Sequence, residues 1–232
     1  MIGIRKLLRK ADPVRLLLTG FIFAILAGSI LLTLPISSSR GVSQPFIDAL
    51  FTATSAISTT GLVVVDTGSF YSVFGQIVIL VLVQIGGLGY MVLIAFAVYA
   101  MGKRLSAPAV KMLEESITGV SFETAQRFAQ LTIVFTFLFE FAGALILCLY
   151  WMRQFPVGHS IYLGIFHSIS GFCTAGFGLF GDNLCSCKGS LVVNVTIWLI
   201  CIGGGIGFFV LIDTYDFLGK LARHRYTAPL GR

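Results

Sequence analysis

The feature that most constrains this chain is a set of four long stretches that are almost free of charge. They are Leu16–Ser39, Val73–Met101, Phe128–Met152 and Gly189–Ile212, and the only charged side chain inside them is Glu140. A membrane-spanning helix needs about 20 consecutive, mostly apolar residues. Over the whole chain 56% of residues are apolar and 11% are charged, against about 45–50% and 25% in soluble domains. The sequence therefore predicts an all-α integral membrane protein with four spans.

Two further apolar segments, Pro45–Ser58 and Ser160–Cys173, are too short to cross a membrane and fit re-entrant helices. The basic residues support this interpretation. With four spans, thirteen of the sixteen lie on the side that holds both termini, and only Arg40, Arg153 and Lys188 lie on the other. Cytoplasmic loops are rich in Lys and Arg, so both termini are predicted to be cytoplasmic. Counting either short segment as a span would destroy this asymmetry.

The chain reads as an internal duplication in which each half has the order span, short helix, glycine-centred loop, span. FTATSAISTTGLVV, which starts at Phe51, matches FHSISGFCTAGFGL, which starts at Phe166, at a constant offset of 115. GGLGY, from Gly86, matches GGIGF, from Gly204, at an offset of 118. Both short helices face the outer side, so the repeat is parallel, and parallel repeats are related by an axis along the membrane normal. A pore on that axis is the predicted product.

The loops after the short helices carry the candidate chemistry. Irregular backbone at membrane depth must be buried in protein or line a water-filled cavity. STTGLVV and CTAGFGL contain no acidic side chain, so backbone carbonyls would have to coordinate a dehydrated cation, as in potassium-channel filters. Gly61 and Gly176 permit the positive φ that lets successive carbonyls face one axis. The hydroxyls of Thr59, Thr60 and Thr174 can hold the strand. The alternative is an ordinary glycine-containing turn.

DALFTATSAISTTGLVVVDTG, QIGGLGYMVL and FHSISGFCTAGFGLFGDNL together resemble the Trk/Ktr/HKT superfamily of cation transporters, and most of all its KtrB-type potassium-translocating subunit. The resemblance runs from about Asp12 to Gly219. It implies potassium-channel-like M1–P–M2 units, four around one pore in the bacterial plasma membrane, each with a filter loop centred on glycine. A glycine at the position of Gly61 implies potassium. The implied filter residues are Thr59, Thr60, Gly61, Leu62, Thr174, Ala175, Gly176 and Phe177.

Only two of the four units are present, so we expect either a truncated or partial product, or a half-subunit that pairs with itself or with a second half-pore. The resemblance also implies a cytosolic nucleotide-binding regulatory partner, facing the inner loop that contains Glu114, Glu115 and Glu123. Channel-like transport and sodium-coupled transport both stay open. The rival interpretation is a non-transporting assembly or stator-like subunit of a larger complex, against which the filter-like loops argue.

The predicted segments are a cytoplasmic N-terminus (1–13), the first unit (14–101), a cytoplasmic loop (102–126), the second unit (127–219) and a cytoplasmic C-terminal segment (220–232). Glu140 has two interpretations, a cation-attracting or gating carboxylate or a protonated or hydrogen-bonded side chain packed against the short helix. His159 and His167 lack ligand-spaced partners, and the GGxG runs read as helix-packing sites. No enzymatic motif, cofactor or nucleic-acid partner is predicted.

Overall fold

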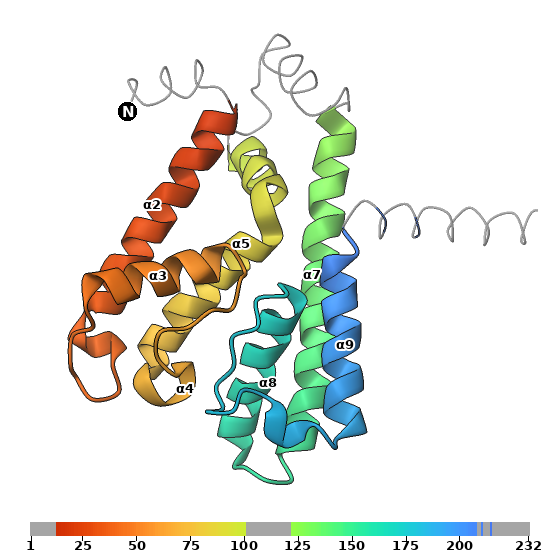
Figure 1. Ribbon diagram of the computed structural model, residues 1–232. Coiled ribbons are helices and arrows are strands. Elements are labelled where there is room, and N and C mark those ends of the chain that lie inside the picture. The colour runs from red at the N-terminus through yellow and green to blue at the C-terminus, as the bar shows by residue number, and fades with distance from the viewer. Residues whose placement is uncertain (1–12, 101–121, 208–209, 211–213, 215–232) are drawn as a thin grey trace, which may run out of the picture.

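The computed structural model describes residues 13–100, 122–207, 210 and 214. Within these ranges the regular elements are all helices, and the one strand-like feature is an isolated bridge between Ser38 and Tyr71. Figure 1 shows two groups of helices standing side by side. We call them the first unit, which contains α2, α3 and α5, and the second unit, which contains α7, α8 and α9. The predicted segments 1–13, 102–126 and 220–232 lie almost entirely outside the described residues.

The first unit begins with α2 (Pro13–Thr33), followed by the short helix η1 (Pro35–Ser37). Helix α3 (Phe46–Ile57) is the first predicted short helix, and Pro45 precedes it at the N-cap. A one-turn helix, α4 (Thr67–Phe70), is capped by the Asp66 side chain, which accepts a hydrogen bond from the Ser69 amide. Helix α5 (Val73–Ala100) completes the unit. In Figure 1, α3 lies across α2 and α5 at mid-height.

The second unit repeats this order with α7 (Phe122–Trp151), α8 (Val157–Phe172), η2 (Cys185–Cys187) and α9 (Leu191–Gly205). Two of these helices begin three or more residues before the predicted starts. Helix α7 begins inside the predicted cytoplasmic loop. Helix α8 begins three residues before the predicted Ser160, directly after Pro156 at its N-cap. Proline is tolerated at a helix start because the amide it lacks would be unpaired there anyway.

The second and fourth predicted spans are interrupted at equivalent glycines. Helix α5 breaks at Gly89, with φ 62° and ψ −172°. Helix α9 ends two residues before Gly207, which has φ 88°. The two positions differ by 118, the offset of the GGLGY and GGIGF motifs. Apolar composition predicted uninterrupted helices, but a residue in this left-handed conformation stops the regular helical hydrogen-bonding pattern.

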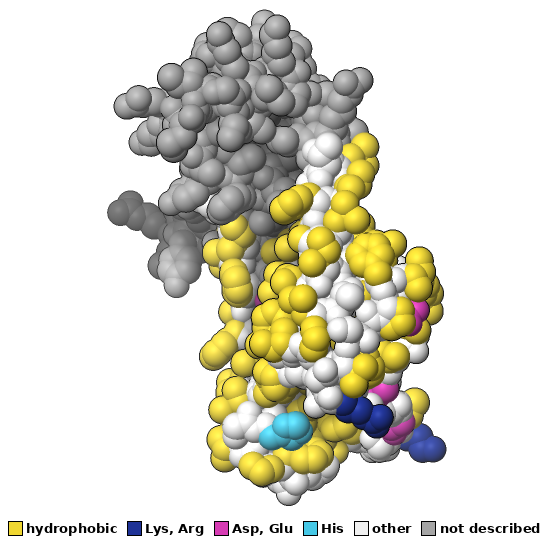
Figure 2. Space-filling model, turned by 90° about the vertical axis from the view of Figure 1, so that its left-hand side faces the viewer, with side chains coloured by type: hydrophobic (Ala, Val, Ile, Leu, Met, Phe, Trp, Pro, Cys, Tyr) yellow, Lys and Arg dark blue, Asp and Glu magenta, His cyan; other side chains and the backbone are white. Residues whose placement is uncertain are grey.

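One helical segment among the described residues, Gln130–Trp151, is long and apolar enough to cross a membrane by itself. The other apolar segments are shorter, at 10–17 residues: Leu18–Thr33, Phe46–Ile57, Val73–Gly89 and Leu191–Gly205. Figure 2 shows apolar side chains over most of the described part of one face, while charged side chains gather in its lower half. The number of spans predicted from the sequence stays a prediction.

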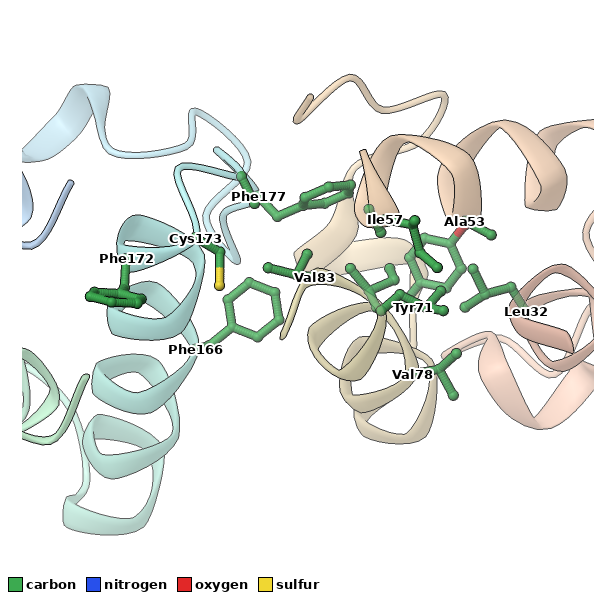
Figure 3. Close-up of a cluster of buried hydrophobic side chains, with 14 of the residues drawn as sticks. Leu32, Ala53, Ile57, Tyr71, Val78, Val83, Phe166, Phe172, Cys173 and Phe177 are labelled. Carbon is green, nitrogen blue, oxygen red and sulfur yellow. The ribbon is translucent and has the colours of Figure 1, made fainter. Parts of the chain in front are cut away.

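The two units pack through a shared apolar core. Phe166, Cys173 and Phe177 of the second unit belong to one buried cluster with Ile57 and Val83 of the first. Figure 3 shows Phe166 beside Val83 and Phe177 close to Ile57. Phe166 is 0% exposed. The ends of the two short helices and the loops that follow them are therefore held together at the centre of the described structure.

Candidate functional site

The loops that follow α3 and α8 have the same backbone hydrogen bonds. In the first loop, the amides of Thr59 and Thr60 donate to the carbonyls of Ala56 and Ser55, at 3.2 and 3.0 Å. In the second, the amides of Thr174 and Ala175 donate to the carbonyls of Gly171 and Ser170, at 3.0 and 2.8 Å. Each donor and acceptor in one loop lies 115 residues from its counterpart in the other. The offset found in the sequence therefore describes a real geometric repeat.

The left-handed residues of the two loops also correspond. Thr59 and Gly61 have φ of 51° and 78°, and Thr174 and Gly176 have φ of 52° and 74°. Positive φ at the two glycines was predicted. Positive φ at the two threonines was not, because a β-branched residue rarely adopts it. In an extended strand, successive carbonyls point to opposite sides. Left-handed residues at every second position cancel this alternation, so successive carbonyls can point to the same side.

The two loops are in direct backbone contact at their central glycines. A Cβ built on Gly61 would lie 2.3 Å from the Ala175 carbonyl oxygen, and one built on Gly176 would lie 3.8 Å from the Gly61 Cα. The Ala175 carbonyl is therefore directed at the first loop. Of the eight predicted filter residues, the structure brings Gly61, Ala175 and Gly176 together, while Leu62 is exposed and Phe177 is buried in the core.

The GGxG runs pack against the C-terminal ends of α3 and α8, where the two loops begin. A Cβ on Gly86 would lie 1.9 Å from the carbonyl oxygen of Ile57, the last residue of α3. A Cβ on Gly204 would lie 1.7 Å from that of Phe172, the last residue of α8. No residue larger than glycine fits at either position without moving backbone. The predicted packing role of these motifs is confirmed, and equivalent glycines perform it in both units.

Side chains hold the second loop far more firmly than the first. Ser170 Oγ donates to the Phe177 carbonyl at 2.7 Å, and Asn183 Nδ2 donates to the Gly176 carbonyl at 3.0 Å. The Leu179 amide donates to His167 Nε2 at 3.3 Å. In the first loop the equivalent of Ser170 is Ser55, whose buried hydroxyl has no hydrogen-bond partner. The repeat is thus symmetric in backbone but not in side-chain support.

His167 has a structural environment. Its Nδ1 lies 2.9 Å from the Leu163 carbonyl, so both ring nitrogens are engaged, and the ring packs against Trp151 and stacks on Phe180. Among the described residues there is no group of three or more His, Cys, Asp or Glu side chains that could hold a metal ion.

Glu140 lies at the boundary between the units. Its side chain is 6% exposed, and Oε1 accepts a hydrogen bond from Gln84 Nε2 of α5 at 2.8 Å. Its own carbonyl accepts from Ser168 Oγ of α8 at 2.7 Å. Glu140 thus joins three helices, two from its own unit and one from the other. The side chain is therefore hydrogen-bonded to α5, and the contact with the second short helix is made by the backbone carbonyl. Both predicted roles of the Glu140 carboxyl group stay predictions.

Sequence reasoning missed the polar contacts that join the units and lock the second loop. The residues concerned are Gln76, Gln84, Tyr162, Ser170 and Asn183. Gln76 and Gln84 gave a usable signal, since they are the two polar side chains in the otherwise apolar run Val73–Gly89. Tyr162 OH donates to Gln76 Oε1 at 2.7 Å. These residues are far apart in the chain, so no local sequence pattern predicts their hydrogen bond.

Comparison with known proteins agrees with this architecture. The TrkH family, described as "Cation transport protein", matches residues 18–224. The chain is 40% identical to Ktr system potassium uptake protein B of Bacillus subtilis over 87% of its own length and 45% of that protein. It is 38% identical to the protein of the same name from Vibrio alginolyticus, over 89% and 45%. It is 33% identical to the potassium/sodium uptake protein NtpJ of Enterococcus hirae, over 97% and 50%.

The chain spans about half the length of the curated relatives that it matches. These relatives are named as transport proteins rather than enzymes. The family match covers most of the chain and includes both units with their glycine-centred loops. The chain therefore belongs to the TrkH family of cation transport proteins, within the Trk/Ktr superfamily, and is KtrB-like.

Proposed function

We propose that this chain provides half of a pore for potassium uptake across a bacterial plasma membrane. The observation that carries the proposal is the pair of matched loops, which share hydrogen bonds and positions of positive φ and meet at Gly61 and Gly176. A carbonyl-lined filter is built from several loops that share one backbone geometry, and the two matched loops support the proposal in that respect. The proposed filter residues are those predicted from the sequence, residues 59–62 and 174–177.

Electrostatics at the loops favours a cation. Helices α3 and α8 both end at the loops, and the C-terminal end of a helix carries roughly half a negative charge. The side chains of the loops supply no acidic group, so selectivity would follow from how many carbonyls surround the ion and how they are spaced. Potassium is the proposed ion because glycine occupies the central position of both loops and because two relatives are named for potassium uptake.

The proposal is for half a pore because two loops supply about half of the roughly sixteen carbonyls that a four-loop filter offers. The remainder would come from a second half-pore or a second copy of this chain. The Ktr system names of the relatives fit a multi-component assembly, and we include a cytosolic nucleotide-binding regulatory subunit in the proposal. Both termini are placed in the cytoplasm on the strength of the basic residues alone.

Rubidium uptake distinguishes this function from a stator-like assembly role. We expect proteoliposomes that contain a tandem fusion of two copies of the chain to take up rubidium, and excess potassium to compete more strongly than excess sodium. Sodium added on the uptake side separates the two transport modes, because only a coupled transporter is accelerated by it. Vesicles with a fusion that carries Gly61→Ser and Gly176→Ser are the matched control. Equal rubidium content in both preparations and in empty vesicles would refute the proposal.

A further inference from the structure

The carbonyl of Gly176, at the centre of the second loop, is bonded to a side chain that lies outside the predicted filter residues. Asn183 Nδ2 donates to this oxygen at 3.0 Å. A carbonyl oxygen has two lone pairs, so the bond to Asn183 leaves one of them for another partner. The direction of the Gly176 carbonyl, a ligand in the proposed filter, therefore depends on where the Asn183 amide lies.

The turn that carries Asn183 is itself closed by hydrogen bonds. The Asn183 backbone has φ 58°, in the left-handed region that asparagine adopts more readily than most residues. Its backbone amide donates to the Phe180 carbonyl at 2.8 Å, and the Asp182 side chain accepts from the Ser186 amide at 2.7 Å. These bonds lie on both sides of Asn183, so the turn fixes the point from which its side chain reaches the loop.

A glycine in the loop makes room for the Asn183 side chain. A Cβ built on Gly178 would collide with Asn183 Oδ1. Gly178 does not have a positive φ, so the space for the amide, rather than its own backbone conformation, requires glycine there. The oxygen of the Asn183 amide packs against the loop and the nitrogen bonds to it, so both ends of the amide contact residues 176–178.

The first unit has no amide side chain at the equivalent position. Its aspartate, Asp66, corresponds to Asp182, and each accepts a hydrogen bond from a backbone amide that follows it in the chain. The next residue is Thr67 in the first unit and Asn183 in the second. Threonine has no NH₂ group, so an amide bond of this kind to the central carbonyl belongs to the second unit.

We propose that Asn183 is a positioning residue, which sets the direction of the Gly176 carbonyl and so contributes to discrimination between potassium and sodium. Carbonyl-lined filters discriminate through the size of the cavity and through the number and strength of the carbonyl dipoles around the ion. Sodium is the smaller ion, so carbonyls must move inward to coordinate it. The Gly176 carbonyl cannot do so without stretching its bond to Asn183, and this bond therefore favours potassium.

Two substitutions remove the bond in different ways. Asn183→Gly deletes the amide and tolerates the left-handed backbone, whereas Gly178→Ala displaces the amide and leaves Asn183 in place. An ordinary hydrogen bond changes an equilibrium by about two- to tenfold. In proteoliposomes with the tandem fusion, we expect both substitutions to lower the preference for potassium over sodium by up to about that factor. The preference is measured as the competition of each ion with rubidium uptake.

Asn194→Ala is the matched control. The Asn194 amide also donates to backbone carbonyls, those of Cys187, Lys188 and Ser190, but these lie outside the proposed filter. Its loss should leave the ion preference unchanged. An equal fall in preference for Asn194→Ala and Asn183→Gly would overturn the proposal, because general loosening of the outer loop would then explain both. An unchanged preference in Asn183→Gly or in Gly178→Ala would also overturn it.

A spectroscopic measurement tests the bond without transport. Asparagine occurs in the sequence at positions 183 and 194 alone, so ¹⁵N labelling of asparagine gives two kinds of side-chain NH₂ signal, which Asn183→Gly assigns. In solid-state NMR of the same proteoliposomes, replacing potassium by sodium should shift the Asn183 signal, because the ion and the amide share one carbonyl. The Asn194 signal should stay where it is. An Asn183 signal that is identical in the two salts would refute the proposal.

Asn183 has this role only within the proposed filter, but the two proposals fail separately. A fusion whose Asn183 signal responds to the ion and which takes up no rubidium would refute the proposed function and leave the role of Asn183 intact. Selective rubidium uptake that Asn183→Gly leaves unchanged would refute the role of Asn183 alone.

Discussion

Serine substitution of three glycines separates backbone strain from contact between the loops. Gly41, Gly61 and Gly176 have φ of 68°, 78° and 74°, so serine at each pays a similar left-handed penalty of about 1–2 kcal/mol. Their surroundings differ. A Cβ at Gly41 meets nothing within 4 Å, and one at Gly176 meets the Gly61 Cα at 3.8 Å, an ordinary contact. A Cβ at Gly61 lies 2.3 Å from the Ala175 carbonyl oxygen.

The extra cost at Gly61 follows from that distance. Real Cβ contacts are essentially never shorter than 3.0 Å, so the two loops must separate by at least 0.7 Å. Overpacking of this kind typically costs a further 1–3 kcal/mol. We therefore expect Gly61→Ser to destabilise the chain by about 2–5 kcal/mol, and Gly41→Ser and Gly176→Ser by about 1–2 kcal/mol each. Denaturant unfolding of the purified chain in detergent micelles measures this order.

Ion selectivity should respond in a different order. Displacing the Ala175 carbonyl changes the spacing of the proposed ligands, so Gly61→Ser in the tandem fusion should lower the preference for potassium over sodium. Gly176→Ser should act in the same direction but more weakly, and Gly41→Ser, outside the loops, should leave the preference unchanged. An unaltered potassium-to-sodium uptake ratio for Gly61→Ser at normal expression would refute the filter assignment. Equal destabilisation by all three substitutions would refute the contact argument.

Three further experiments test other parts of the structure. Single cysteines at Ser43 and Asp66, on either side of α3, should both react with an impermeant thiol reagent from outside the cell, and labelling from opposite sides would make α3 a span. The lone chain should insert into the membrane yet fail to restore growth of a potassium-uptake-deficient bacterium, so full rescue by a species of monomeric size would contradict the half-pore. Glu140→Gln keeps an acceptor for Gln84, whereas Glu140→Leu leaves the half-buried Gln84 amide without this acceptor, at a cost of up to about 1–3 kcal/mol. Unfolding should therefore separate these two variants, and equal stability would show that the hydrogen bond does not brace the units.

Local pattern was enough to predict the repeated elements. The short helices, the glycine-centred loops and the 115-residue offset follow from residue types at fixed spacings, and the structure reproduces them at Phe46–Ile57 and Val157–Phe172. Pattern could not predict the helix breaks at Gly89 and Gly207, because an isolated glycine in an apolar run is equally compatible with close packing. Gly86 and Gly204 do pack in that way.

The polar contacts between units lay beyond the sequence for a different reason. The bond from Tyr162 to Gln76 joins residues 86 positions apart, and its existence depends on how two whole units dock. Positive φ at Thr59 and Thr174 is likewise imposed by tertiary structure against the local preference of threonine. The sequence therefore identified the loops, and only the fold revealed which atoms hold them in place.

The unequal support of the two loops has a consequence for how each copy of the repeat can change. In the second loop a substitution at Ser170, Asn183 or His167 removes one member of a bonded pair and strands the other, so acceptable changes must come in compensated combinations. In the first loop the Ser55 hydroxyl has no hydrogen-bond partner, so alanine there leaves no side-chain partner unpaired. Of two positions that a duplication leaves identical, the one at Ser55 can therefore change by a single substitution, while the one at Ser170 is constrained by the hydrogen bond that its side chain makes.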